Sequence, residues 1–308
     1  MARPRIVCVG LATVDLIQRV ERLPGPDEKV ESLRTDTAAG GPATNAAIAA
    51  AALGADVTLV TAVGPHPLGG LIRADLAEYG VSLVDTATGG APPPVSAVTV
   101  LDGTGERAVV SRNARGATVD VPDDRVFAGA DAVLADGHHP ALARAAARSG
   151  RPLVLDAGSW RPVFAELLPV AAVTACSSVF RPPGTDDAEA VPGPPGAPGA
   201  RGVEAASAPP GARGVEAALR RLGVGVGAIT RGPDPVRWWS GAEAGELAVP
   251  AVEAVDTAGA GDAFHGALTV AVARGAGLTD ALRFAIEIAT VRVQHRGPRS
   301  WLAALPAS

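Results

Sequence analysis

The chain has 308 residues, 47% of them apolar but only 3% aromatic, which suits one large α/β domain or two modest ones with a core of Ala, Val and Leu. A net charge of −5 without any basic tract argues against nucleic acid as a partner, and every apolar run is broken by Gly, Pro or charge before the roughly 18 residues that a membrane span requires. Cys8 and Cys176 are too few for a disulfide framework or a cysteine metal site, and they fit a reducing cytoplasm.

The first predicted element is a buried strand, Ile6 to Val9, which ends at Gly10. Asp15 follows just beyond its carboxyl end, the edge at which open α/β sheets bind ligands. Asp15 is therefore a candidate binding residue, although a single Asp after a strand is usually a turn or cap residue.

Two segments far apart in the sequence, 15–37 and 92–110, are polar and alternating and do not resemble core. The second reads as a hairpin of two strands, Val95 to Leu101 and Arg107 to Val110. We expect the two segments to pair in a small sheet that covers a ligand site; two ordinary surface hairpins are the alternative. Residues 1–14, 38–91 and 111–308 then form the α/β core.

Paired glycines, Gly40 and Gly41, precede a very Ala-rich helix that Gly54 closes. Paired glycines let a ligand approach the backbone closely, and Asn45 offers both a donor and an acceptor to a sugar hydroxyl.

Strands and helices then alternate, which predicts a mostly parallel sheet with helices on both faces. The predicted strands are 57–63, 132–135, 153–155 and 172–176, the helices are 71–79, 141–148 and 163–168, and 81–84 is an extended piece that enters the small sheet.

Polar residues follow several of these segments. Asn113 is a candidate sugar contact or only a turn residue, and Arg112 either meets an anionic substituent or is solvated. His138 and His139 suggest a metal, but no third ligand has suitable spacing to them. We expect their loop to line the active cleft, as does the loop that carries Asp156, Ser159 and Trp160.

Residues 182–213 break the pattern, because they are rich in Pro, Gly and Ala, and the octet at 199–206 recurs identically at 211–218. We expect a disordered surface insert without a function, followed by a helix over 215–222.

The last third of the chain begins with a strand, Val226 to Thr230, that leads into Arg231 and Gly232. A hairpin follows, made of strands 236–240 and 245–255 and carrying Trp238 and Trp239. A long helix is predicted over 280–293, and residues 297–300 then close the site.

The junction after Val255 carries the chemistry. The chain passes through Gly259, Ala260 and Gly261 into a helix predicted over 262–274. The uncovered N–H groups and the positive end of the helix dipole favour an anion such as a phosphoryl group. Asp262, in the first turn, is placed to take a proton from a hydroxyl beside that anion, although an Asp there is often only a cap.

Two strings in register resemble the signatures of the ribokinase-like (PfkB) family of carbohydrate and nucleoside kinases. They are Asp-Thr-x-Gly-Ala-Gly-Asp-x-Phe at 256–264 and Gly-Gly-x-x-x-Asn-x-Ala at 40–47. The resemblance covers nearly the whole chain except the insert. It implies the ribokinase-like α/β fold with a small β-sheet lid, and transfer of the γ-phosphoryl group of ATP to a primary hydroxyl of a sugar.

The resemblance also implies roles for individual residues. Asp262 is the base, and the amides of Gly259, Ala260 and Gly261 form the anion hole. Asp15, Gly40, Gly41, Asn45 and Asn113 bind the sugar. The nucleotide is bound by Thr230, Arg231, Gly232, Thr257, Gly259 and Gly261, with Trp238 and Trp239 near its edge.

The metal ligands depart from the family pattern. Relatives carry an Asn-x-x-Glu segment whose Glu organises the waters of Mg²⁺, whereas Cys176-Ser177-Ser178-Val179 has no acid before Asp186, Asp187 and Glu189. The resemblance also allows a monovalent cation such as K⁺ near Asp256, Gly297 and Ser300, although Ala258 replaces a hydroxyl of some relatives.

The triplet Phe264-His265-Gly266, the His138-His139 pair and the Ser159-Trp160 corner are most similar to the ketohexose kinases of the family (fructokinase, ketohexokinase and sulfofructose kinase). A nucleoside kinase is the first alternative, but the small sheet lacks an aromatic residue for base stacking. A non-catalytic sugar or nucleotide sensor is the second, motivated by the missing Glu. A homodimer through the lid is left open.

Overall fold

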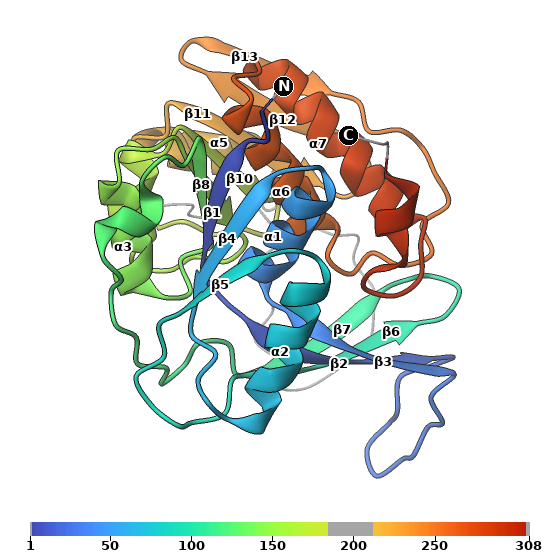
Figure 1. Cartoon of the computed structure of the whole chain (residues 1–308). Helices are drawn as coiled ribbons and strands as arrows, with labels where there is room; N and C mark the ends of the chain where they lie inside the picture. The colour runs from blue at the N-terminus through green and yellow to red at the C-terminus, as the bar shows by residue number, and fades with distance from the viewer. Residues whose placement is uncertain (1, 184–211, 306–308) are drawn as a thin grey trace.

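The structure is a computed structural model that describes residues 2–183 and 212–305. A nine-stranded sheet runs through its centre in the order β13-β12-β11-β10-β9-β8-β1-β4-β5 (Figure 1). The strands from β11 to β5 are parallel, and β12 and β13 are antiparallel additions at one edge. They span β1 (Arg5–Val9), β4 (Asp56–Thr61), β5 (Ser82–Asp85), β8 (Ala132–Ala135), β9 (Leu153–Ala157), β10 (Val173–Ser177), β11 (Val226–Arg231), β12 (Asp234–Ser240) and β13 (Glu243–Leu247).

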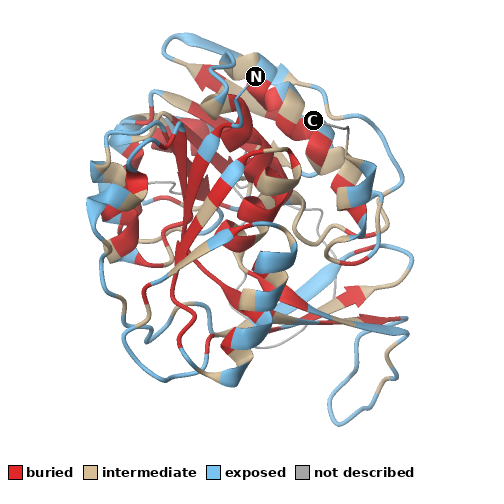
Figure 2. Cartoon of the chain, viewed as in Figure 1, coloured by how far each residue is buried: buried red, intermediate tan, exposed pale blue. Residues whose placement is uncertain are grey.

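Helices cover both faces of this sheet. One face carries α1 (Pro42–Ala52), α2 (Pro67–Glu78), α6 (Ala260–Ala273) and α7 (Leu278–Val293), and the other carries α3 (Pro140–Arg148), α4 (Phe164–Leu167) and α5 (Ala212–Arg221). Each face has its own cluster of buried apolar residues, so the strands are buried on both sides (Figure 2). Continuous apolar strands are typical of a parallel sheet between two helical layers.

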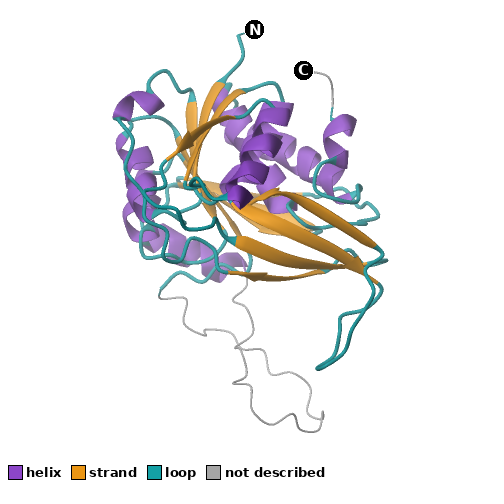
Figure 3. Cartoon of the chain, turned by 60° about the horizontal axis from the view of Figure 1, so that its bottom comes forward, coloured by secondary structure: helices purple, strands orange, loops and turns teal. Residues whose placement is uncertain are grey.

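A second sheet of four strands, hereafter the small sheet, has the order β3-β2-β6-β7 (Figure 3). Its strands are β2 (Thr13–Val20), β3 (Arg34–Gly40), β6 (Val95–Leu101) and β7 (Arg107–Ser111). The predicted segments 15–37 and 92–110 thus pair with each other, because β2 runs parallel to β6 with Asp15 beside Ser96. The predicted α/β architecture with a small β-sheet is confirmed.

Several predicted boundaries are wrong. The strand expected over 245–255 ends at Leu247, because the residues after it have no strand partner and Pro250 has no N–H to donate. Residues 81–84 do not enter the small sheet, since β5 pairs with β4 at the edge of the large one. Asp15 lies beyond the end of β1, as predicted, and belongs to β2 of the small sheet, which begins at Thr13.

Some helices also differ from their predicted spans. Helix α2 begins at Pro67, four residues before the predicted start, since proline is favoured in the first turn of a helix. Helix α5 begins at Ala212 rather than 215, and α4 is a single turn. Most of the predicted insert falls on 184–211, outside the described residues.

The described part of the chain contains no helix long and apolar enough to cross a membrane. Cys8 and Cys176 are both free and buried.

Candidate active site

The catalytic candidates meet at a cavity of about 270 Å³, hereafter the main cavity, between the small sheet and the starts of α1 and α6. Strands β2, β3, β6 and β7 supply one wall, and the motif residues with α7 supply the other. Of the residues predicted from sequence, the cavity wall includes Asp15, Gly41, Asn45, Asn113, Asp256, Gly259, Gly261 and Asp262. Residues separated by more than two hundred positions therefore face one space, at the carboxyl edge of the sheet.

Asp262 lies in the first turn of α6, as predicted. Gly259 precedes the helix with φ of 72°, in the left-handed region that favours glycine. The amide of Ala260, the first of the helix, donates to the carbonyl of Thr257 at 3.4 Å. Burial raises the pKa of the Asp262 carboxyl, while a hydrogen bond from Asn45 opposes that rise. A carboxylate with a raised pKa is a stronger base than an exposed one.

Asn45 is held in a fixed orientation. Its Nδ2 donates to Oδ2 of Asp262 at 2.8 Å, and its Oδ1 accepts from Nη1 of Arg299 at 3.1 Å. Arg299 is itself anchored by the carbonyl of Ala39 at 2.6 Å and by Asp75 at 3.0 Å. The amide of Asn45 therefore directs its donor at the carboxylate of Asp262.

Sequence reasoning missed Arg299. It predicted that residues 297–300 close the site, but no motif marks this guanidinium, whose partners Asn45 and Asp75 lie 254 and 224 positions away. Its Nε is buried and has no hydrogen-bond partner among the described residues.

Asp15 faces the main cavity from β2. Thr13 donates to it at 2.5 Å, and burial raises the pKa of its carboxyl, with the charge of Asp262 contributing. Its side chain lies against the backbone of Gly40, where an added Cβ would be 2.0 Å from Oδ2 of Asp15. Gly40 therefore makes room for Asp15 rather than lining the cavity itself. Asp15 and Asp262 give the cavity two carboxylates able to accept hydroxyl protons.

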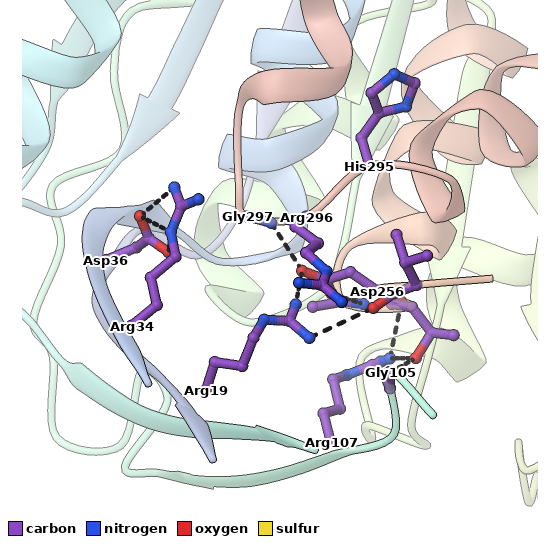
Figure 4. A network of polar contacts seen from close by, with 12 residues as sticks. Arg19, Arg34, Asp36, Gly105, Arg107, Asp256, His295, Arg296 and Gly297 are labelled. Atoms are coloured by element: carbon purple, nitrogen blue, oxygen red, sulfur yellow. Dashed lines mark hydrogen bonds and ion pairs between the residues drawn. The ribbon is translucent and has the colours of Figure 1, made fainter. Parts of the chain in front are cut away.

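Asp256 is a buried anchor on which Arg19 and Gly297 converge (Figure 4). Its side chain is only 1% exposed and pairs with Arg19 at 3.1 Å and with Arg292 at 3.5 Å. The amides of Ala258 and Gly297 donate to its two oxygens at 3.0 and 2.9 Å. Because Arg19 belongs to β2, this carboxylate links the small sheet to the turn before α6.

The turn between β6 and β7 docks on the same segment (Figure 4). Thr257 donates its hydroxyl to the carbonyl of Gly105 at 2.9 Å, and Arg107 donates to the carbonyl of Thr257 at 3.0 Å. An added Cβ at Gly105 would lie 2.9 Å from the amide nitrogen of Asp256, so only glycine permits this approach. Thr257, predicted to bind nucleotide, uses its hydroxyl to hold the small sheet.

The residues near Asp256 do not fit a separate monovalent cation. Nη1 of Arg292 donates to the carbonyls of His295 and Asp256, at 2.9 and 3.4 Å, and its guanidinium is 3% exposed. A hard cation requires free oxygen ligands, and here a fixed guanidinium occupies them. The hydroxyl of Ser300 donates to the carbonyl of Arg296 instead.

The structure does not bring the predicted nucleotide turn to the main cavity. Thr230 donates to the carbonyl of Cys176 at 3.4 Å, and Arg231 donates to the carbonyl of Pro235 at 2.8 Å within the β11–β12 hairpin. Trp239 is fully buried and donates to the carbonyl of Val224, so it belongs to the core. Thr230 and Arg231 lie at the carboxyl end of β11, beside that of β10.

The predicted histidines make contacts within the fold, and His138 also lines a second cavity. Nδ1 of His138 lies 3.1 Å from Asp136 and its Nε2 is 2.5 Å from Arg161, while burial lowers the pKa of His139. The ring nitrogens of His265 lie 2.7 Å from the carbonyl of Gly261 and 3.2 Å from that of Ala175, so this side chain fastens α6 to β10.

Trp160 and the acids expected near the metal do not contribute to the described site. Trp160 packs against Phe164 and Phe180. Within residues 2–183 and 212–305, no group of three or more His, Cys, Asp or Glu side chains is arranged to hold a metal ion. Asp186, Asp187 and Glu189 fall outside those residues.

Comparison with known proteins gives consistent matches. The model of the "pfkB family carbohydrate kinase" matches residues 3–304. A ribokinase of Arabidopsis thaliana is 28% identical over 307 residues, 96% of this chain and 77% of that protein. An ATP-dependent ribose-1-phosphate kinase of Halopiger xanaduensis is 31% identical over 160 residues, 50% of this chain and 54% of the other.

Solved structures of the same type superimpose over nearly the whole chain. A putative ribokinase from Agrobacterium tumefaciens has a TM-score of 0.79 at 26% identity, covering 98% of this chain and 94% of its own. The Arabidopsis ribokinase in complex with ribose and ATP has a TM-score of 0.71 at 24% identity, with both chains fully covered, and shares the fold.

Proposed function

Because this chain belongs to the pfkB family of carbohydrate kinases, we propose that it transfers the γ-phosphoryl group of ATP to a primary hydroxyl of a sugar held in the main cavity. The observation that carries the proposal is the position of Asp262, which faces this cavity from the first turn of α6, directly after the Gly259–Gly261 turn. A base and an anion site on one helical turn are what phosphoryl transfer to an alcohol requires.

The proposed reaction uses the residues as follows. The hydroxyl oxygen of the sugar attacks the γ-phosphorus, the bond from that phosphorus to the bridging oxygen of ADP breaks, and Asp262 takes the hydroxyl proton. The amides at the start of α6 and its dipole stabilise the charge on the transferred group. Arg292, close behind Gly259, keeps a fixed positive charge beneath this site.

Asp15 and Asn45 bind the sugar in this proposal, with Gly41 and Asn113 beside them. The small sheet is the lid that excludes water, held by the contacts of Arg19 and Gly105 to the catalytic turn. The acceptor is a pentose or a ketohexose. The names of the relatives favour a pentose, and His265, part of the string that suggested a ketohexose, does not line the cavity.

The nucleotide lies, in the same proposal, along the carboxyl ends of β10 and β11, next to Thr230, Arg231 and Gly232. Mg²⁺ enters as part of the nucleotide substrate, held by phosphate oxygens and water, because the described side chains offer no metal site. It would lower the repulsion between the phosphates and the attacking hydroxyl.

A nucleoside acceptor is the second candidate. The strands of the small sheet have no aromatic residue, but Trp301, 4% exposed, is among the residues that line the main cavity. Nucleosides therefore belong in the substrate panel.

A dimer formed through the small sheet would use its outer edge. Val110 of β7, the strand at that edge, is 76% exposed and does not line the main cavity. Sedimentation velocity of the wild type and of Val110→Lys tests this, since a charge placed in such an interface would shift the chain to monomer.

The deciding experiment measures ADP release with Mg-ATP across ketohexoses, pentoses and nucleosides, for wild type and Asp262→Asn. We expect one sugar class to turn over, and the variant to lose about 10²–10⁴-fold in kcat, the range for a general base. Equal thermal stability of the two proteins is the control. A variant as active as wild type would show that Asp262 is not the base.

A further inference from the structure

A second cavity of about 440 Å³, hereafter the arginine cavity, adjoins the main one. Its wall contains one alanine and six polar residues, Ser111, Arg112, Asn113, Arg115, His138 and Arg161. Ser111 and Asn113 also line the main cavity, so the two spaces meet at the end of β7. Among the residues that the structure describes, no carboxylate lines the arginine cavity.

The three guanidinium groups of this cavity lack acidic partners. Within the described part of the chain, none of them forms an ion pair with a carboxylate, whereas Arg34, Arg144 and others at the surface do. Arg112 and Arg115 are exposed and Arg161 is half-buried beside His138.

Asp136 and Asp156 attract the guanidinium of Arg161, but neither lines the cavity. Asp136 is buried, does not line the cavity, and accepts from the amides of Leu11, Ala43 and His138. Its remaining close contact is the ring of His138. Three positive charges around the arginine cavity repel each other, and an anion bound among them offsets this electrostatic repulsion.

We propose that the acceptor sugar carries an anionic group, a phosphate monoester, which Arg112, Arg115 and Arg161 bind in the arginine cavity. The proposal rests on the proposed kinase function and specifies its substrate class. A planar guanidinium donates two parallel hydrogen bonds to a phosphate, so three of them converge well on one phosphate group. The phosphorylated end of the sugar then lies away from Asp262, and the free hydroxyl lies beside it.

The position of the cavity assigns this anion to the acceptor rather than to ATP. Its wall comes from the chain after β7 and from the loops after β8 and β9. In the described part of the chain, it contains no residue from the ends of β10 and β11 or from the start of α6. The molecule that reaches it is therefore the one bound near Asp15 and Asn113.

The test is calorimetric titration of the Asp262→Asn variant, which permits binding to be measured without turnover. The ligands are ribose 1-phosphate, ribose 5-phosphate, fructose 1-phosphate and fructose 6-phosphate, each compared with ribose or fructose, together with inorganic phosphate and ADP. We expect at least one ester to bind ten or more times more tightly than its neutral parent, roughly the value of one charge-assisted hydrogen bond.

Two substitutions locate the effect. Arg112→Gln and Arg115→Gln should each weaken that ester roughly 10-fold or more and leave the neutral sugar and ADP unchanged. Arg125→Gln, an exposed arginine paired with Asp123 away from this cavity, is the matched control and should change nothing.

The outcomes separate this proposal from the kinase function. If neutral sugars turn over and no ester binds better than its parent, the kinase function stands and the anionic acceptor is refuted. If the substitutions weaken ADP instead of the ester, the cavity serves the nucleotide and the proposal is refuted. If an ester binds through the arginines but wild type never phosphorylates it, the binding site stands and the kinase function for that ligand fails.

Discussion

Replacing Asn45 by alanine should make the catalytic base harder to ionise. Nδ2 of Asn45 donates to Asp262 at 2.8 Å, and Arg299 holds the amide in that orientation. This bond stabilises the carboxylate and opposes the effect of burial, which raises the pKa of Asp262. Without it the pKa of Asp262 rises further, so the ionised fraction falls at every pH below that pKa.

The expected size follows from one hydrogen bond to a charged group, worth about 1.5–3 kcal/mol. At 1.4 kcal/mol per factor of ten, kcat/KM on the acid limb of the pH profile should fall roughly 10- to 100-fold. The loss should shrink on the alkaline plateau, where Asp262 is ionised in both proteins. The assay is ADP release under MgATP saturation between about pH 5 and about pH 9.

Asn45 also faces the sugar, so a uniform loss at all pH values would come from weaker binding alone. Ser96→Ala, in the same cavity but hydrogen-bonded to Asp15 rather than Asp262, is the control and should leave the acid limb in place. If the limb of Asn45→Ala stays where it is in wild type, the contact to Asp262 does not tune the base and this reasoning is refuted.

Three further predictions concern stability and ions. Arg292→Met should lower the free energy of unfolding in urea by about 3–5 kcal/mol, the cost of breaking a buried ion pair. Because the guanidinium occupies the place of a cation, KCl but not choline chloride should restore part of the activity of this variant. Burial raises the pKa of Asp156 to about 6, so the wild type loses stability as pH rises from about 4 to about 6. Asp156→Asn cannot ionise. Its free energy of unfolding should exceed that of the wild type by up to about 3 kcal/mol at pH near 8 and equal it at pH near 4. Gly266→Ala should destabilise the fold by about 1–3 kcal/mol, because its Cβ would lie 2.5 Å from the carbonyl oxygen of Ala46 in α1.

Each of these has an outcome that contradicts it. Activity of the wild type that depends on K⁺ would show that Arg292 does not occupy the place of an ion. A gain from Asp156→Asn that is the same at both pH values would show that ionisation is not its cause. Gly70→Ala in α2, where nothing lies within 4 Å, is the control for Gly266 and should stabilise by roughly 0.5–1 kcal/mol; equal responses at both sites would remove the steric argument.

The sequence by itself determined the parts of the site that are local in the chain. A glycine in the left-handed region, small neighbours and an acid in the first helical turn occupy seven consecutive positions from Asp256 to Asp262, so their relative geometry follows from the strand-to-helix turn alone. The same holds for Gly41 and Asn45, which are separated by one turn of α1. Apolar periodicity likewise determined the layered architecture, because a strand buried on both faces must be apolar along its whole length.

Only the tertiary structure decided which arginines surround those motifs. Arg19, Arg292 and Arg299 reach Asp256 and Asn45 across 237, 36 and 254 positions. A guanidinium stands at the end of a long flexible chain and its partner is set by the packing of whole elements, so neither periodicity nor a motif marks it. Tertiary structure also decides why the strand predicted over 245–255 ends at Leu247: the segment alternates like a strand, but the residues after Leu247 have no neighbouring strand to pair with. A strand is stabilised by hydrogen bonds to another segment, and that segment is chosen by the fold.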